Sequence, residues 1–348
     1  MSHARFRHAA LAALTHPVLL PLGTAFTHGV APILMFHRFA DAGAGNPGHA
    51  PDVLRAHLAF LRRHRFDLVP LGDLLRRLET GEPPLLRAVA FTVDDGYADF
   101  ATVGCGIFAE FDCPVTVFAV TGFLDGRCWL WWDQVELVLE TTRRPSALVP
   151  LPDASLHYRL DDPPARGRAC ADLVERLKRV DDATRRAAIA ALARDLDVEL
   201  PAAPPARYAP MTWDDARRCC ARGATFGPHT VTHPVLSRVA DRESECEIRD
   251  SWSRVRAELP GGPPVFCYPN GDRDSFTPRE QRLVRAAGMA AAVTTVDGFA
   301  SGRGLRADAG AGRYAVPRFP YLEGTAAFRQ IVVGFERAKR GVRGLLRD

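Results

Sequence analysis

Short apolar segments recur along the chain, and amphipathic segments separate most of them. The apolar segments are APILMF, RAVAFTV, CPVTVFAV, GATFG, PPVFCY and AAAVTT. A strand that is apolar on both faces is typical of a parallel sheet covered by helices. The alternation therefore predicts an α/β fold, either a parallel sheet or a barrel, in which functional groups gather at the carboxyl ends of the strands.

Two of the amphipathic segments predict helices between strands. VLRAHLAFLRRHRF places Leu54, Leu58 and Leu61 on one helical face, and YADFATVGCGIFAEF follows the sequence DDG directly. A third helix is predicted to start at Pro234 and to run through VLSRVADRESECEIRDSWSRVRAEL. Because a residue before a proline avoids the helical region, His233 is predicted at the threshold of that helix.

The alternation of strand-like and helix-like segments is interrupted between residues 142 and 205. A polar, strand-like piece, LVPLPDASLHYRL, precedes ADLVERLKRVDDATRRAAIAALARDLDVEL, which is rich in Arg, Ala and Leu and predicts one or two helices. We interpret this segment as an inserted, mostly helical subdomain or lid. A pair of surface helices without a function fits the pattern equally well.

Composition and charge narrow the class of protein. The 348 residues are 47% hydrophobic and 25% charged, and the net charge of +4 is spread along the chain without runs. This pattern does not indicate binding to nucleic acid or to an anionic membrane. The eight cysteines form no CxxC pair, which favours reduced, mostly buried thiols in a cytoplasmic protein.

The ends of the chain are predicted to lie outside the main domain, which spans residues 31–330. Residues 1–30 carry basic residues and then a mildly apolar stretch that Pro17 and Pro21 interrupt. We interpret this stretch as a helical segment of a cytoplasmic protein; a signal peptide of an exported protein is the alternative. Residues 331–348 predict a C-terminal helix or tail. No segment reaches the ~20 apolar residues of a membrane-spanning helix.

Ionisable residues follow three of the predicted strands. His37 follows ILMF, Asp94 and Asp95 follow AVAFTV, and His229 and His233 follow ATFG. Two histidines four residues apart can meet one metal ion if the backbone turns between them, and a carboxylate completes a site with open positions. Either aspartate could be that carboxylate. From the residues alone, DDG could also be a turn that only ends a strand, and the histidines could be surface or capping residues.

These segments resemble motifs of the polysaccharide deacetylase family (carbohydrate esterase family 4, NodB homology domain). FTVDDG is similar to the family's T-F-D-D-G, and GPHTVTHPVLS is similar to its G-S-H-T-x-T-H-P-x-L. LMFHRF and FCYPNG resemble blocks of the branch whose catalytic histidine lies near the N-terminus. The blocks keep a consistent order from about residue 33 to about residue 320. The resemblance implies a distorted (β/α) barrel of about seven strands, interrupted by the inserted subdomain.

The resemblance also implies a set of site residues. A divalent metal ion, most often zinc in this family, would be held by Asp95, His229 and His233. Asp94 would be the general base for the attacking water, and His37 would be the acid that protonates the departing sugar amine.

Three positions depart from the family's motifs. Asn270 corresponds to the residue whose backbone N–H stabilises the oxyanion, but the motif has an aromatic residue there and an arginine where this chain has Cys267. The charge that orients the base must therefore come from elsewhere. Arg318, in VPRFPY, is our candidate, and a surface arginine is the alternative reading. Pro228 replaces the usual serine, which removes a hydroxyl without changing a ligand.

Two neighbouring tryptophans, in LWWDQVE, are further candidates for sugar contacts. Aromatic rings stack on the apolar faces of sugars, so Trp131 or Trp132 could form a subsite wall, but packing in the core is the more common role.

The sequence therefore predicts a metal-dependent hydrolase that removes N-acetyl groups from an amino-sugar polysaccharide or its lipid-linked precursor, as in exopolysaccharide biosynthesis. The expected partner is a glycan or lipid-linked saccharide, with no nucleic acid and no membrane span; the oligomeric state has no signature in the sequence. Two alternatives stay open. One is a hydrolase of a non-sugar amide such as a ureide, and the other is a catalytically silent glycan-binding protein, which the missing motif arginine allows.

Overall fold

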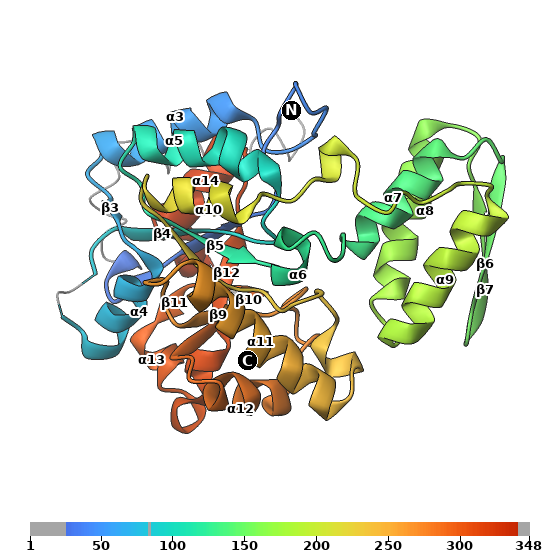
Figure 1. Cartoon of the computed structure of the whole chain (residues 1–348). Coiled ribbons are helices and arrows are strands. Elements are labelled where there is room, and N and C mark those ends of the chain that lie inside the picture. The colour runs from blue at the N-terminus through green and yellow to red at the C-terminus, as the bar shows by residue number, and fades with distance from the viewer. Residues whose placement is uncertain (1–25, 83–84, 340–348) are drawn as a thin grey trace.

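The main body of the protein is a barrel of parallel strands enclosed by helices, with a smaller lobe to one side (Figure 1). The computed structural model describes residues 26–82 and 85–339. Seven strands follow one another around the barrel in the order β8, β5, β4, β2, β12, β10 and β9. Their bounds are β2 Ile33–Phe36, β4 Ala88–Val93, β5 Val115–Ala119, β8 Ala224–Pro228, β9 Val265–Cys267, β10 Ala291–Asp297 and β12 Val316–Pro320.

Every neighbouring pair along this path is parallel, and the two end strands lie side by side. Gly227 of β8 permits the approach of β9, because a Cβ atom at this position would come within 2.8 Å of the carbonyl oxygen of Val265. An eighth strand, β3 (Asp67–Leu68), pairs with β4. The barrel is thus nearly closed, and the predicted (β/α) barrel of about seven strands is confirmed.

The strands of the barrel are buried on both faces, as their apolar sequences predicted. In β4, Phe91 and Val93 belong to a core shared with the outer helices. Ala88 and Ala90 belong to a second core that also contains Leu74 of helix α4 (Leu71–Thr80). The alternation of a strand's side chains between its two faces explains this division. The sheet is therefore covered on both sides, and its polar groups are left to the strand ends.

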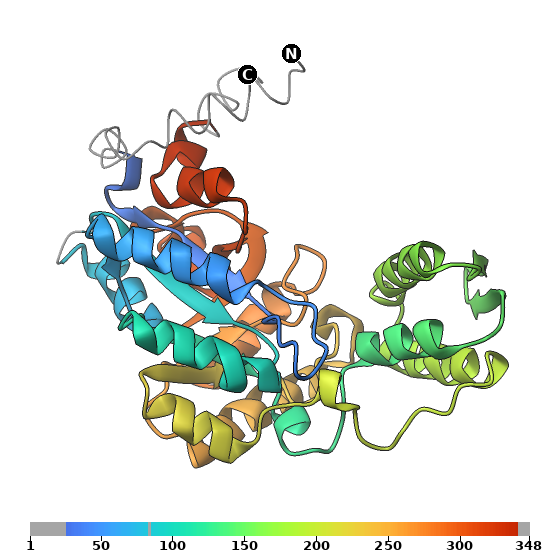
Figure 2. The same ribbon diagram turned by 90° about the horizontal axis from the view of Figure 1, so that it is seen from above.

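Helices surround the barrel in both views (Figures 1 and 2). The predicted helix after the first strand is confirmed as α3, and the segment after DDG forms a π-helical turn that continues into α5. The bounds are α3 Pro51–Arg63, π-helix Phe100–Gly104, α5 Cys105–Glu110, α6 Thr121–Leu124, α10 Trp213–Cys220, α11 Asp241–Glu258, α12 Pro278–Ala286, α13 Gly302–Leu305 and α14 Thr325–Val332. A short antiparallel pair, β1 (Val30–Ala31) and β11 (Ala300–Ser301), lies outside the barrel sheet.

The prediction that a helix starts at Pro234 is wrong, because helix α11 begins at Asp241. His233 has φ 59°, and this left-handed conformation cannot lead directly into a right-handed helix. A 3-10 turn at Leu236–Arg238 follows, and its Leu236 is buried in the main core. The seven residues before α11 therefore form a packed loop instead of a helix.

Strand β12 is the one barrel strand that the apolar pattern did not indicate. Its sequence, VPRFP, contains two prolines and an arginine, which are uncommon in central strands. The strand nevertheless pairs with β2 and β10. Arg318 therefore lies within a barrel strand.

The lobe has a hydrophobic core of its own. It contains α7 (Trp131–Thr141), an antiparallel hairpin of β6 (Ser146–Leu151) and β7 (Ala154–Arg159), α8 (Pro163–Leu177) and α9 (Asp182–Asp195). Its core includes Leu139, Leu173 and Ile189 and is separate from the barrel cores. The lobe thus begins with α7, before residue 142, and stands apart from the barrel in Figures 1 and 2.

Residues 1–25 and 340–348 lie outside the described residues, so the predictions made for the two ends of the chain stay predictions. Within the described residues, no helix combines the length and the hydropathy needed to cross a bilayer. All eight cysteines are free, and four of them are buried.

Candidate metal and catalytic site

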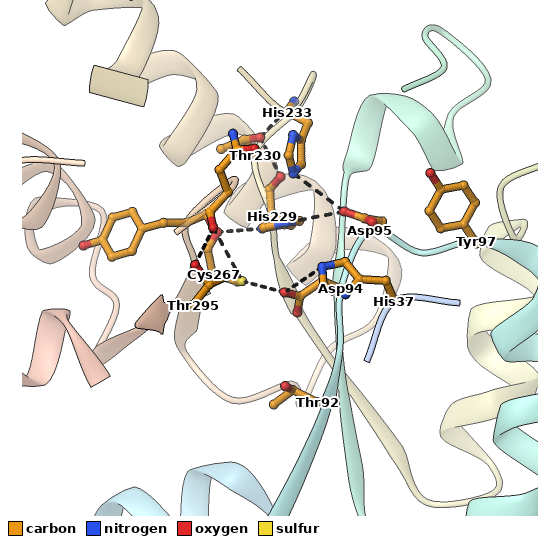
Figure 3. Close-up of polar contacts among 12 residues, drawn as sticks. His37, Thr92, Asp94, Asp95, Tyr97, His229, Thr230, His233, Cys267 and Thr295 are labelled. Carbon is orange, nitrogen blue, oxygen red and sulfur yellow. Dashed lines mark hydrogen bonds and ion pairs between the residues drawn. The ribbon is translucent and has the colours of Figure 1, made fainter. Parts of the chain in front are cut away.

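The structure brings the predicted ionisable residues together at the carboxyl ends of three strands of the barrel (Figure 3). His37 follows β2, Asp94 and Asp95 follow β4, and His229 follows β8. The Oδ1 atom of Asp95 lies 3.6 Å from the Nε2 atom of His229 and 3.6 Å from that of His233. The Nε2 atom of His37 lies 3.9 Å from Asp94 Oδ2. The residues converge because parallel strands place all their carboxyl ends at the same end of the barrel.

The two adjacent aspartates point in different directions. Asp95 has φ 74° and Gly96 has φ 93°, so the chain turns sharply just after the end of β4. Asp95 faces the two histidines of the 229–233 loop, and Asp94 faces His37 and Cys267 (Figure 3). The turn thus separates two carboxylates that are neighbours in sequence into two different environments.

The loop between the two histidines is held by side-chain hydrogen bonds. Thr230 has φ 66°, and its hydroxyl donates to the carbonyl of His229 at 2.5 Å and accepts from the backbone N–H of His233 at 3.0 Å. Glu247 of α11 accepts from the backbone N–H groups of residues 231 and 232 at 2.7 and 2.9 Å. Positive φ values in non-glycine residues cost energy and persist only where the surroundings hold them. The loop is therefore built to bring both imidazoles to one point.

Asp95, His229 and His233 fit a metal ion. All three are at least 97% buried, yet their facing atoms are 3.6 Å apart, which is too far for hydrogen bonds. In a tetrahedral zinc site with bonds of about 2.0–2.1 Å, neighbouring ligand atoms lie about 3.4 Å apart. Burial lowers the pKa of His229 to about 4 and holds that of His233 well below 6.5, so both imidazoles are neutral and can ligate.

The carboxyl group of Asp95 supports the same reading. Burial, and then the negative charges of Asp94 and Asp133, raise its pKa well above the usual range. A cation at this point would stabilise the ionised carboxylate that burial disfavours. The donor set of one carboxylate and two imidazoles is the one that the sequence predicted.

A second group, Asp94, His229 and Cys267, also has its ligand atoms within 4.8 Å of one another, but it suits a metal less well. The Nδ1–H of His229 donates to the carbonyl of Cys267 at 2.8 Å, which leaves Nε2 as the free nitrogen, and Nε2 faces Asp95. Burial raises the pKa of the Cys267 thiol, and the guanidinium of Arg318 lies 3.2 Å from the sulfur. A cation beside this arginine would be repelled, so the group with Asp95 is favoured.

Arg318 is fully buried and forms a bidentate ion pair with Asp94. Its Nη1 donates to Asp94 Oδ1 at 2.8 Å, and its Nη2 donates to Oδ2 at 2.7 Å. The remaining donors bond Thr92 Oγ1 and the carbonyl of Thr294, both at 2.9 Å. Burial alone would raise the pKa of Asp94, but the charge and hydrogen bonds of Arg318 outweigh burial and hold it well below its usual range.

His37 lies at the edge of the site, and 47% of its side chain is accessible. Its surroundings in the cavity lower its pKa, chiefly by desolvation, while the negative charge of Asp94 opposes that lowering. An imidazole in this place can exchange a proton with solvent and with a group bound beside Asp94.

Asn270 sits in a tight turn after β9. Its φ is 59°, and the following Gly271 is required because a Cβ atom there would lie 2.8 Å from the backbone nitrogen of Thr295. The carbonyl of Asn270 accepts from the Thr295 hydroxyl at 2.6 Å. Among the described residues, no acceptor faces the backbone N–H of Asn270. Since this residue lines the same cavity as the metal-site residues, the N–H is available to a ligand.

A cavity of about 670 Å³ connects these residues with the lobe. This volume is within the range of about 300–1,000 Å³ that small-ligand sites occupy. The barrel contributes the residues described above, together with Arg38, Tyr97 and Tyr268. The lobe contributes Trp132, Asp133 and Glu136 from α7 and five residues of α8 and its C-terminal end.

Three cavity residues are linked in a buried network that the sequence did not indicate. The Tyr97 hydroxyl donates to Asp133 Oδ2 at 2.7 Å and accepts from Trp132 Nε1 at 3.0 Å. The Trp132 and His233 rings pack edge to face, with their centroids 4.6 Å apart. Burial raises the pKa of Asp133 to about 7, although the hydrogen bond from Tyr97 opposes this change. Tyr97 could have been suspected because it directly follows DDG, but Asp133 carried no such signal.

The two tryptophans of LWWDQVE have different places. Trp131 is only 6% exposed and packs in the core of the lobe. Trp132 is half-buried and lines the cavity. Trp131 thus packs in the core, as the more common role predicts, and Trp132 lies in the wall of the cavity.

Comparisons with known proteins match these observations. Residues 182–292 match the family model for polysaccharide deacetylase, a range that includes both histidines and Asn270 but not the two aspartates. A search of the curated proteins found no match.

Among solved structures, the chain is similar to the Streptococcus pyogenes deacetylase PplD in complex with acetate, at 18% identity and a TM-score of 0.55, covering 87% of this chain and 97% of that one. It is also similar to a de-N-acetylase from Aggregatibacter actinomycetemcomitans, at 14% identity and a TM-score of 0.52, covering 85% and 96%. A third is IcaB from Ammonifex degensii, at 14% identity and a TM-score of 0.51, covering 87% and 97%. The family model over residues 182–292 and the shared fold both support the resemblance that the motifs predicted.

Proposed function

We propose that this protein is a metal-dependent hydrolase that removes N-acetyl groups from an amino-sugar polysaccharide or its lipid-linked precursor. One observation carries the proposal. The adjacent carboxylates are divided between two environments, with Asp95 facing two neutral imidazoles and Asp94 held ionised by Arg318 beside His37. Hydrolysis of an amide needs a Lewis acid, a base and an acid in one place, and this arrangement can supply all three.

Asp95, His229 and His233 would hold the metal ion, and zinc suits this donor set. When bound, the ion would polarise the acetamide carbonyl and lower the pKa of a water molecule. The five-residue loop that carries both histidines and the turn at Asp95 fix these three side chains before any ligand arrives. This preorganisation is what a catalytic metal site requires.

Asp94 would accept the proton of the attacking water at its carboxylate. Arg318 keeps the group ionised and fixes its orientation, so the base is ready over a wide pH range. His37, 3.9 Å from Asp94 Oδ2, would give a proton to the departing amine nitrogen, because an amine anion is too poor a leaving group. The backbone N–H of Asn270 would donate to the oxygen of the tetrahedral intermediate.

Arg318 also bears on the alternative of a silent glycan-binding protein. That alternative rested on the absence of the motif arginine, for which this chain has Cys267. In the structure the Cys267 sulfur and the guanidinium of Arg318 are in contact, and the guanidinium reaches Asp94 from β12. These contacts support Arg318 as the orienting charge, supplied from a strand other than that of Cys267, and they count against the silent alternative.

The test is acetate release by zinc-loaded protein across a panel of N-acetylated glycans, with metal content measured on the same samples. We expect release in the wild-type protein and a loss of roughly 100-fold or more in Asp94→Asn, with zinc retained. Acetate release that is undiminished in Asp94→Asn would overturn the assignment of the base. Turnover of ureides with none of acetylated sugars would instead support the non-sugar amidase.

A further inference from the structure

We propose that the lobe supplies a second sugar subsite, in which α7 and α8 bind a neutral, hydroxyl-rich sugar unit next to the unit that is deacetylated. This inference rests on the proposed function and names the substrate class: an uncharged saccharide of at least two units. The strand ends of the barrel line one side of the cavity, and α7 and α8 of the lobe give it a second wall.

Helix α8 turns one of its faces toward the metal site. The residues of α8 and its C-terminal end that line the cavity recur at helical spacing, so they share a face. A different face, with Leu173 and Leu177, packs in the core of the lobe. The cavity-lining face consists of Cys170, Ala171, Val174, Glu175 and Lys178.

Four charged groups that line this side of the cavity form two ion pairs, and Asp133 is hydrogen-bonded to Tyr97. Lys178 Nζ lies 2.6 Å from Glu175 Oε1, and Arg207 Nη2 lies 2.5 Å from Glu136 Oε1. A wall of paired charges has little net field to attract an anionic ligand, but it offers donors and acceptors side by side. This is the chemistry that recognises sugar hydroxyls, and it favours a neutral saccharide over a polyanionic one.

An aromatic ring and the catalytic residues border the same space. The half-buried Trp132 lines the cavity between the lobe and His233, where its ring could cover the apolar face of a sugar. Desolvation in the cavity is the main cause that lowers the pKa of His37, and the Lys178 ammonium adds to this lowering, so the α8 wall lies within electrostatic reach of the proposed acid. A saccharide that reaches from His37 to Lys178 would occupy both parts of the cavity.

The experiment uses N-acetylglucosamine and its oligomers of two to five units as probes. Their binding to zinc-loaded Asp94→Asn protein is measured by calorimetry, so that turnover does not interfere. We expect affinity to rise from the monomer to the oligomers. Adding Lys178→Ala, which removes a donor, or Ala171→Leu, which fills the space without a hydrogen-bonding group, should weaken oligomer binding by about five- to tenfold and leave monomer binding unchanged.

Two further variants provide controls. Arg168→Ala removes a charge from an exposed position of α8 outside the cavity lining and should bind every probe like the parent. Lys178→Arg keeps a donor and should restore most of the oligomer affinity. Equal affinity for monomer and oligomers, no binding of any probe, or oligomer binding that ignores Lys178 and Ala171 would overturn the subsite.

Acetate release by the wild-type protein from the same sugars separates the two proposals. Release from all lengths with equal kcat/KM would leave the deacetylase function standing and remove the subsite. Oligomer binding that depends on Lys178, without acetate release from any probe, would retain the subsite and count against deacetylation of these sugars.

Discussion

Arg318 of β12 and Asp94, which directly follows β4, form a buried bidentate ion pair with N···O distances of 2.8 and 2.7 Å. Thr92, in β4 two residues before Asp94, accepts a further hydrogen bond from this guanidinium. The pair places an arginine in contact with Cys267, the residue that stands where the family's motif has its own arginine. Arg318 thus brings a positive charge to Asp94 from β12, beside the β9 residue Cys267.

Arg318→Lys should lower kcat by about 100-fold, because a lysine cannot hold both carboxylate oxygens and the base would lose its orientation. The acid limb of the kcat/KM profile should also move to higher pH. The base works when deprotonated, and without the guanidinium the burial of Asp94 raises its pKa. A pH series with metal content checked at each point measures both effects; an unmoved acid limb would contradict the orienting role.

A double variant that moves the arginine from position 318 to position 267 provides the matched control. In Arg318→Ser the buried Asp94 loses its partner, and we expect a loss of stability of about 3–5 kcal/mol along with activity. Adding Cys267→Arg should restore part of both, because the Cys267 sulfur lies 3.5 Å from Asp94 Oδ2 and 3.2 Å from Arg318 Nη2. Denaturant unfolding and acetate release report the two recoveries separately.

Removal of a metal ligand should abolish metal-dependent stabilisation. For the wild-type protein, free zinc at about 100-fold above its Kd should raise the free energy of unfolding by about 2.7 kcal/mol, and chelation should reverse this rise. Asp95→Asn or His233→Ala should weaken zinc binding by at least about 100-fold, since even indirect changes at metal sites cost 10–100-fold. His157→Ala, an exposed histidine on the lobe, is the control and should behave like wild type.

His37→Ala should harm amide substrates far more than activated esters. An acetamide needs a protonated leaving amine, so we expect its kcat to fall by roughly 100-fold or more, whereas 4-nitrophenyl acetate releases a stable anion and should react at nearly the wild-type rate. The wild-type rate on amides should fall as pH rises through the pKa of His37, which its surroundings lower. This limb should vanish in the variant. Equal losses on both substrates would contradict the acid role.

His57 should contribute to acid sensitivity of the fold, away from the site. It is buried, stacks on Phe328 at 4.0 Å and shares a 2.7 Å hydrogen bond with Tyr321, and burial lowers its pKa to about 4. The unfolded chain, with a pKa of about 6.5, binds the extra proton first as pH falls. The stabilisation is therefore complete above about pH 6.5 and is lost progressively from there down to pH 4.

The variant His57→Phe keeps an aromatic ring but cannot titrate. Between pH 7 and pH 4.5, wild type should lose roughly 2 kcal/mol more stability than this variant, as urea unfolding at several pH values would measure. Parallel loss in the two proteins would show that His57 does not titrate as its burial implies.

Local sequence determined the strands and the residues that end most of them. Apolar runs such as AVAFTV must be buried on both faces, and a polar residue directly after such a run lies at the edge of the sheet. The place of Asp94, Asp95 and His229 followed from this rule, because each is within two residues of a strand end. The start of the helix after His233 did not follow from this rule. The left-handed φ of His233 depends on Thr230 and on the packing of the loop.

Only the tertiary structure decided which distant groups act on those residues. The contact of Arg318 with Asp94 joins positions 224 residues apart, and it exists because β12 lies beside β2 and β2 beside β4 in the barrel. In the same way, side chains of α8 and of the strand ends line one cavity although they are far apart in the sequence. Sequence patterns record local periodicity and turn chemistry, whereas such long-range contacts depend on how the chain packs, and no local pattern encodes them.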